Sequence, residues 1–166
     1  MNDQDTVAQR KASQRLISRA YYYMRFRLRT EKEMQTYLEK KAIEYSYALP
    51  IVDITMRELR ELGYLDDRRF VESFILSHQN AKQKGKFLLR NELMHKGISE
   101  DIIDNFFVDN PLDEESLALQ ALKKRWPRLL QFDRPKRLKK SYDFLRRKGF
   151  GYDTVKKTIE EMEEKG

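Results

Sequence analysis

Few side chains in this sequence could carry out catalysis. Its 166 residues include no cysteine and two histidines, His78 and His95, which stand far apart on different predicted helices. Without cysteine there is no thiol nucleophile, disulfide or Cys-ligated metal, and two isolated histidines lack the spacing of a metal site. No serine lies in a Gly-x-Ser-x-Gly elbow, and no glycine-rich loop is available to hold a phosphate. We therefore expect no enzymatic activity, no metal and no cofactor.

The adjacent carboxylates Asp66 and Asp67 allow two interpretations. They could bind a divalent metal as a pair, but a nuclease-type site needs further acidic residues that converge on the same ion. They also stand shortly before an apolar stretch that begins at Phe70, where a short acidic side chain caps the start of a helix. We prefer helix capping at this turn.

Recognition of opposite charge is the chemistry that the sequence favours. The 34 Lys and Arg outnumber the 27 Asp and Glu, which gives a net charge of +7. Residues 123–149 alone hold 12 basic and 2 acidic side chains, and smaller basic stretches lie at 25–32 and 82–90. Such dense positive charge favours a polyanion or an acidic protein as partner. The candidate binding residues are Arg25, Arg27, Arg29, Lys32, Lys82, Lys84, Lys86, Arg90, Lys123, Lys124, Arg125, Arg128, Lys136, Arg137, Lys139, Lys140, Arg146, Arg147 and Lys148.

Aromatic side chains accompany the basic stretches, and such residues often stack on nucleic-acid bases. The run Tyr21-Tyr22-Tyr23 spans about 200° of a helix surface, so at least one ring must be exposed or at an edge. Trp126, between basic residues, is either a hydrophobic residue at a helix end or an exposed contact. Four phenylalanines follow apolar helix stripes and are expected in the core: Phe70, Phe74, Phe106 and Phe107.

Helices are the elements that must position these residues. With 37% charged residues, six Gly, four Pro and apolar side chains at helical intervals, the sequence predicts an all-α fold. About nine helices are expected, starting near residues 8, 30, 50, 67, 86, 99, 113, 134 and 153, after a polar first dozen residues. Thr30 with Glu33 has the capping-box spacing. Further caps are expected at Asp67, Ser99, Asp113, Asp133 and Asp153, and breaks at Pro111 and Pro127.

Three glycines mark an internal repeat. Gly63, Gly97 and Gly149 each follow a Leu by four residues, precede an Asp by four, and stand directly before an apolar residue. Glycine ends a helix in the left-handed conformation, and the next residue folds back onto the helix end. The pattern predicts an elongated tandem array of three helix-turn-helix-like repeats of three helices each. The predicted ranges are 15–66, 67–110 and 111–166, after a frayed segment at 1–14.

The segment Gly63-Tyr64-Leu65-Asp66-Asp67-x-Arg69-Phe70 resembles the RecX family of recombination regulators. The likeness covers about residues 20–107 well and continues loosely to about 160. It implies tandem three-helix repeats that bind along the RecA recombinase filament, restrain strand exchange and coprotease activity, and have a DNA affinity of their own. The family usually has several arginines around the glycine matched by Gly85, where this sequence has lysines. Other matching residues are Ala20, Arg27, Arg29-Thr30-Glu31-x-Glu33, Leu38, Glu92-Leu93 and Lys96-Gly97-Ile98.

Three functions are compatible with these observations. The first, implied by the resemblance, is a non-enzymatic regulator that binds the RecA–DNA filament through the basic stretches and inhibits its recombination and coprotease activity. The second is a general DNA-binding protein without sequence preference, and the third is a helical-repeat adaptor for an acidic protein partner. For the first we expect RecA, single-stranded DNA and double-stranded DNA as partners. We also expect no membrane segment, a cytoplasmic location and a monomer.

Overall fold

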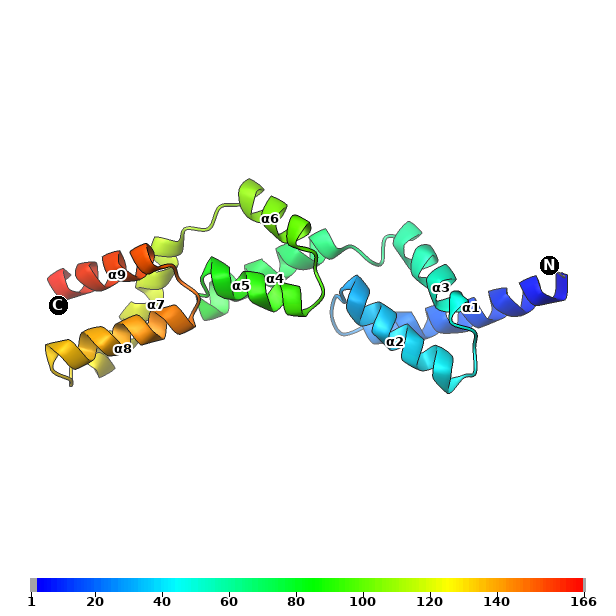
Figure 1. Cartoon of the computed structure of the whole chain (residues 1–166), viewed down its shortest axis with the longest axis horizontal. Helices are drawn as coiled ribbons and strands as arrows, with labels where there is room; N and C mark the ends of the chain where they lie inside the picture. Colours follow the sequence, from blue (N-terminus) through cyan, green and yellow to red (C-terminus); the bar gives the residue numbers. More distant parts are fainter. Residues whose placement is uncertain (1–2, 166) are drawn as a thin grey trace. The chain divides into compact units, whose positions relative to one another are not determined.

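Nine helices make up the part of the chain that the structure, a computed structural model, describes (Figure 1). This part comprises residues 3–165, apart from the side chains of residues 3–5 and 79–81, and it contains no strand. The all-α prediction is confirmed, and eight of the nine helices begin within one residue of the predicted start. The helices are α1 (Asp3–Met24), α2 (Glu31–Glu44), α3 (Pro50–Glu61), α4 (Asp67–Lys82), α5 (Lys86–His95), α6 (Glu100–Asp109), α7 (Glu114–Leu129), α8 (Arg134–Arg147) and α9 (Tyr152–Lys165).

The first helix differs from the prediction, because it begins at Asp3 rather than near residue 8. The residues that were expected to be frayed are therefore helical from Asp3 onward. Residues 8–12 consist of Ala, Gln, Arg and Lys, which favour helices even without burial. Tertiary packing begins at Ala12 and Ser13, and Ser13 Oγ lies 3.1 Å from Thr55 Oγ1 of α3.

Two predicted helix caps are confirmed. Thr30 Oγ1 accepts the Glu33 N–H at 3.1 Å, and the Thr30 N–H donates to Glu33 Oε2 at 3.3 Å, which completes the capping box of α2. Asp113 Oδ1 accepts the Ser116 N–H at 3.0 Å at the start of α7. Both helices therefore start where the sequence placed them.

The start of α4 is capped by Asp66, whereas the prediction named Asp67. Asp66 Oδ1 accepts the N–H groups of Arg68 and Arg69 at 2.9 and 3.1 Å. Asp67 instead accepts the N–H of Glu31 in the first turn of α2, at 2.9 Å. The two adjacent carboxylates thus cap two different helices.

Two other predicted caps and one predicted break are wrong. Asp133 stands at the start of α8 without a side-chain capping bond, and Asp153 lies inside the first turn of α9. Pro127 lies inside α7, two residues before its end, so the helix continues through a residue that has no N–H to donate to the carbonyl four positions earlier. Trp126 is 6% exposed, so it is a hydrophobic residue of the core and not an exposed contact.

The chain divides into two compact units. Unit 1 takes the chain up to Phe70 together with residues 96–102, and its core lies within the first group of helices, α1–α3. Unit 2 takes residues 71–95 and 103–166, and its core lies within the last group, α7–α9. The division passes through the middle group, α4–α6. It does not follow the three predicted repeat ranges, which stay predictions.

The three glycines that were predicted to end helices have left-handed backbones, with φ of +73° at Gly63, +85° at Gly97 and +87° at Gly149. The apolar residue after Gly97 and after Gly149 is buried, as predicted. After the first glycine, however, Tyr64 is 49% exposed and packs edge-on against Tyr21, with 4.9 Å between ring centroids. One of the three turns therefore lacks the expected burial.

Candidate nucleic-acid interface

Two turns that are far apart in the sequence meet inside unit 2. In the turn between α4 and α5, the Gly85 N–H donates to the carbonyl of Lys148, at the end of α8, at 2.8 Å. A Cβ atom on Gly85 would lie 2.4 Å from the carbonyl oxygen of Gly149, and one on Gly149 would lie 2.4 Å from Leu88 Cβ. Only glycine fits such close approaches. This contact brings the basic stretch at 82–90 beside the end of the basic stretch at 123–149.

Four lysines lie at or next to Gln83 at this contact, hereafter the lysine cluster: Lys82 and Lys84 flank Gln83 in the chain, and Lys124 and Lys148 donate to it. Lys148 Nζ donates to the carbonyls of Lys82 and Gln83, and Lys124 Nζ donates to Gln83 Oε1 at 3.2 Å. Gln83 is buried and has a φ of +41°, a conformation that favours glycine. The ammonium of Lys148 thus satisfies carbonyls that the end of α4 leaves without helical partners.

The lysine cluster carries positive charge that its surroundings do not balance. Partial burial lowers the pKa of Lys148, and the charges of Lys124 and Lys84 lower it further. Among the described side chains the cluster has one carboxylate partner, Glu92, which pairs with Lys84. Because like charges held this close repel one another, a bound anion would stabilise the arrangement.

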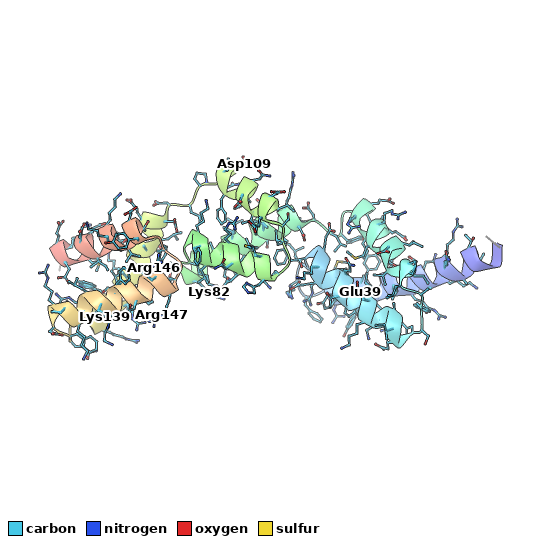
Figure 2. The ribbon with its side chains drawn as sticks, in the orientation of Figure 1. Glu39, Lys82, Asp109, Lys139, Arg146 and Arg147 are labelled. Carbon is cyan, nitrogen blue, oxygen red and sulfur yellow. The ribbon has the colours of Figure 1, made fainter. Side chains whose placement is uncertain are left out.

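Exposed basic side chains continue from the lysine cluster along α8. Figure 2 shows Lys139, Arg146 and Arg147 on this helix and Lys82 near its C-terminal end. Arg146 donates to the carbonyl of Phe150 at 2.9 Å, which fixes its position. Other predicted residues in unit 2 are exposed and have no carboxylate partner within the described part of the chain: Lys86, Lys123, Lys124, Arg125, Arg128, Lys136, Lys139, Lys140 and Arg147.

Two half-buried phenylalanines lie beside these cations. The Nζ atoms of Lys136 and Lys140 are 5.1 and 4.7 Å from the centre of the Phe132 ring. The guanidinium carbon of Arg125 is 4.7 Å from the centre of the Phe144 ring. Cation–π contacts orient a charged group without neutralising it. The charges therefore stay available to an external anion.

Other predicted binding residues are engaged in ion pairs inside unit 2. Arg137 of α8 pairs with Glu163 of α9 at 2.6 Å, and its hydrogen bond lowers the pKa of Glu163. Arg90 of α5 pairs with Asp104 of α6 at 2.9 Å. These arginines hold neighbouring helices together, so their charge is already compensated.

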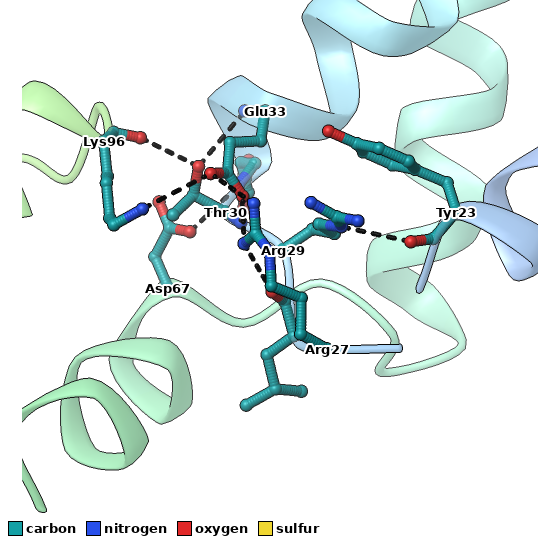
Figure 3. Close-up of polar contacts among 9 residues, drawn as sticks. Tyr23, Arg27, Arg29, Thr30, Glu33, Asp67 and Lys96 are labelled. Atoms are coloured by element: carbon teal, nitrogen blue, oxygen red, sulfur yellow. Dashed lines mark hydrogen bonds and ion pairs between the residues drawn. The ribbon is translucent and has the colours of Figure 1, made fainter. Parts of the chain in front are cut away.

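The basic residues of the α1–α2 loop in unit 1 also divide into those held by partners within the chain and one without a carboxylate partner. Arg27 donates to both carboxylate oxygens of Glu33, at 2.9 and 3.0 Å. Arg29 lies over the Tyr23 ring at 3.8 Å and donates to the Tyr23 carbonyl (Figure 3). Arg25 is exposed and has no carboxylate partner among the described side chains.

A second turn-to-turn contact lies within unit 1. Thr30 Oγ1, which caps α2, also donates to the carbonyl of Lys96 at 2.8 Å, directly before Gly97 (Figure 3). The predicted binding residue Lys32 packs on that glycine, where a Cβ atom would lie 2.1 Å from Lys32 Cδ. The stem of Lys32 is therefore used for packing.

Gln83 and Glu163 take part in this surface, although neither is recognisable from the sequence. Gln83 matters because its backbone is left-handed, and a glutamine gives no sequence signal for that conformation. Glu163 pairs with both Arg137 and Arg134, the latter at 3.1 Å, from a different helix. Helical periodicity shows which residues share a face of one helix, but it does not show which helices meet.

Two other kinds of feature, a metal site and a membrane span, are absent from the described residues. They contain no group of three or more His, Asp or Glu side chains that could hold a metal ion. None of their helices combines the length and the apolar character that a membrane span requires.

Comparison with known proteins identifies relatives over most of the chain. Models of the second and third three-helix domains of RecX match residues 66–105 and 113–159. The regulatory protein RecX of Chlorobium phaeobacteroides is 38% identical over 133 residues, which are 80% of this chain and 83% of that protein. The RecX proteins of Bacillus cytotoxicus and Streptococcus uberis are 29% and 32% identical. The matches cover 91% and 82% of this chain but 55% and 51% of those proteins, so the chain spans about half the length of these relatives.

Solved structures of RecX share the fold. The crystal structure of RecX from Lactobacillus salivarius matches 92% of this chain and 97% of that chain, with a TM-score of 0.80 and 21% identity. A second RecX crystal structure matches 96% of this chain and 78% of that chain, with a TM-score of 0.79 and 23% identity. With the family models and the Chlorobium relative, these findings establish that the chain belongs to the RecX family of regulatory proteins, which are not enzymes.

Proposed function

We propose that this protein binds the RecA–DNA filament and inhibits recombination and coprotease activity, with its own sequence-independent affinity for single- and double-stranded DNA. The observation that supports the proposal is the lysine cluster, where Lys124 and Lys148 contact a turn that carries Lys82 and Lys84, with Glu92 as the one carboxylate partner among the described residues. Family membership supports RecA as the partner. A positive surface with exposed Lys and Arg on α8 suits a phosphate backbone.

The proposed mechanism is differential binding without chemistry. Lysines and arginines that contact phosphates release condensed counterions, which gives affinity without sequence preference and a steep dependence on salt. If the protein binds an inactive form of the filament better than the active form, occupancy shifts the population toward the inactive form. No covalent step is required of any residue.

Titration of the protein into a RecA strand-exchange and ATPase assay, beside a direct DNA-binding titration by fluorescence anisotropy, tests the proposal. We expect inhibition at protein amounts well below those that saturate the DNA. Inhibition that appears only at DNA saturation would favour the general DNA-binding alternative. A protein with no DNA affinity at physiological salt would favour the adaptor for an acidic partner.

Charge neutralisation tests the surface itself. The triple variant Lys82→Gln/Lys139→Gln/Arg147→Gln should reduce the slope of log affinity against log salt by about 2–3 for duplex DNA, since each lost phosphate contact removes about 0.9. A matched control, Lys11→Gln/Lys40→Gln/Arg57→Gln, removes the same charge from exposed positions on α1–α3. Equal slopes for the two variants would exclude the α8 surface as the phosphate contact.

A further inference from the structure

Two exposed aromatic rings and an unpaired arginine lie together where α1 ends. The Tyr22 and Phe26 side chains are 59% and 70% exposed, and their ring centroids are 6.4 Å apart at an interplanar angle of 88°. The guanidinium carbon of Arg25 is 5.3 Å from the Tyr22 ring centre and 4.7 Å from that of Phe26. Each ring therefore keeps a large part of its surface in water while a cation stands between them.

The end of the helix explains this arrangement. The Arg25 N–H donates to the Tyr22 carbonyl at 3.3 Å, which closes a turn directly after Met24, the last residue of α1. A cation at this position is favoured by the partial negative charge of a helix C-terminus. Tyr22 and Phe26, four residues apart, stay neighbours across the turn.

Other aromatic residues are used differently. Tyr23 stacks on Tyr37, with 4.1 Å between centroids and an interplanar angle of 5°, and so contributes to the packing of α1 against α2. Phe87 of α5 is 68% exposed but has no cation over its ring among the described residues. Tyr22 and Phe26 thus combine exposure with a free arginine, and packing does not account for them.

We propose that Tyr22, Arg25 and Phe26 form a stacking site for the bases of single-stranded DNA. Every base has a π-face that an exposed aromatic ring can cover, and an adjacent arginine adds attraction to the base and to its phosphate. The bases of a duplex already stack on one another, so the site discriminates single strands from duplexes. The inference rests on the DNA affinity proposed above and adds the strand form and the residues.

Tryptophan fluorescence gives a direct test. The native Trp126 is 6% exposed, so a Phe26→Trp variant reports on its new ring over a nearly constant background. We expect oligothymidylate to quench this variant strongly, while an abasic oligonucleotide of the same length and a duplex quench it weakly. The Val108→Trp variant is the matched control, since its position on α6 is 78% exposed and lies outside both the stacking site and the basic stretches. Equal quenching by thymidylate and abasic strands, or equal quenching of the two variants, would overturn the proposal.

Affinity measurements complete the test and keep it separate from the proposed function. Tyr22→Ala/Phe26→Ala should weaken binding to oligothymidylate roughly 5- to 100-fold and binding to duplex by less than about twofold. Val108→Ala should change neither, and circular dichroism confirms that all variants fold. If the wild-type chain binds no DNA, the proposed function fails. If it binds DNA and the double variant binds single strands equally well, the stacking site alone fails, and a concurrent loss of RecA inhibition would assign these rings to a protein contact.

Discussion

The two turn-to-turn contacts, one in each unit, share a backbone arrangement. In unit 1, Thr30 at the start of α2 donates to the carbonyl of Lys96, and in unit 2, Gly85 at the start of α5 donates to the carbonyl of Lys148. Both bonds measure 2.8 Å, and each accepting residue stands directly before a left-handed glycine. The same contact is therefore built twice, from a threonine hydroxyl in one case and a backbone N–H in the other.

The two contacts differ in their charge. In unit 1, Glu33 lies between Arg27 at 2.9 Å and Lys96 at 3.6 Å, so one carboxylate serves two cations and the local excess is a single positive charge. In unit 2, the lysine cluster has Glu92 as its carboxylate partner among the described residues. Since the backbone contact forms with either charge balance, it does not require the excess of lysines. The excess positive charge of the lysine cluster is therefore available to bind an anionic ligand.

The turn at Gly63 provides a reference for both contacts. It has the same left-handed backbone, with φ of +73°, but nothing lies within 4 Å of a Cβ atom built on it. Substitution of the three glycines should therefore separate the cost of the backbone conformation from the cost of the contact.

Gly149→Ala should be the most destabilising change. The left-handed backbone costs an alanine about 1–2 kcal/mol, and the new Cβ would lie 2.4 Å from Leu88 Cβ and 2.5 Å from the Leu88 backbone nitrogen. Backbone cannot move aside as a side chain can, so overpacking adds roughly 1–3 kcal/mol. Urea unfolding followed by the fluorescence of the buried Trp126 should show a loss of about 2–5 kcal/mol. A loss near 1 kcal/mol would mean that this contact is open in solution.

Gly97→Ala should cost less, roughly 2–3 kcal/mol, because the obstacle is the side chain of Lys32. Its Cδ and Cγ can swing away, although its Cβ would remain at 2.5 Å. Urea unfolding followed by circular dichroism measures the effect. Gly97→Ala should cost less stability in a Lys32→Ala background than in the wild type, because the shortened side chain leaves more room for the new Cβ. An equal cost in the two backgrounds would contradict the contact.

Gly63→Ala should cost about 1–2 kcal/mol, the backbone conformation alone, since the site is open. The same urea experiment measures it. A loss as large as that of Gly97→Ala would show that the Leu62–Tyr64 turn is covered in solution and would remove it as the reference.

The sequence predicted the glycine series and the helices well, because both depend on local rules. A glycine after a helical stripe, or Thr30 followed by Glu33, determines its own neighbourhood within a few residues. The start of α1 was misplaced because Ala, Gln, Arg and Lys extend a helix without an apolar stripe to announce it. The cap predicted at Asp67 for the start of α4 is made by Asp66, and Asp67 accepts the N–H of Glu31, 36 positions earlier in the sequence.

The candidate site could be predicted only in outline. Charge density located the basic stretches, but the sequence did not show that Lys82 and Lys84 would meet Lys124 and Lys148. That meeting depends on the close approach of Gly85 to Gly149, 64 positions later, which is a tertiary contact. Equally, local charge did not separate Arg125, which stays unpaired by a carboxylate in the described chain, from Arg137, which Glu163 neutralises.

Replacement of Asp67 should have the smallest effect on the free energy of unfolding, and this effect should depend on pH. Burial raises the pKa of its carboxyl above the ordinary value of 3.8, and the charges of Glu31 and Asp66 raise it further, whereas the bond from the Glu31 N–H opposes the rise. Because the folded state then binds more protons than the unfolded state, this carboxyl favours folding most below pH 3.8 and loses that contribution as the pH rises through the folded pKa.

Asp67→Asn keeps an oxygen acceptor for the Glu31 N–H and removes the charge. We expect the variant to differ from the wild type by less than about 1 kcal/mol at pH 7, and the wild type to gain stability relative to the variant as the pH falls toward 3.8 and below. Urea unfolding at a series of pH values measures the difference, and Asp53→Asn, at an exposed position on α3, controls for the loss of a negative charge. A difference that does not change with pH would mean that Asp67 is solvated rather than held against α2, and that the contact in unit 1 rests on Thr30 and Gly97 alone.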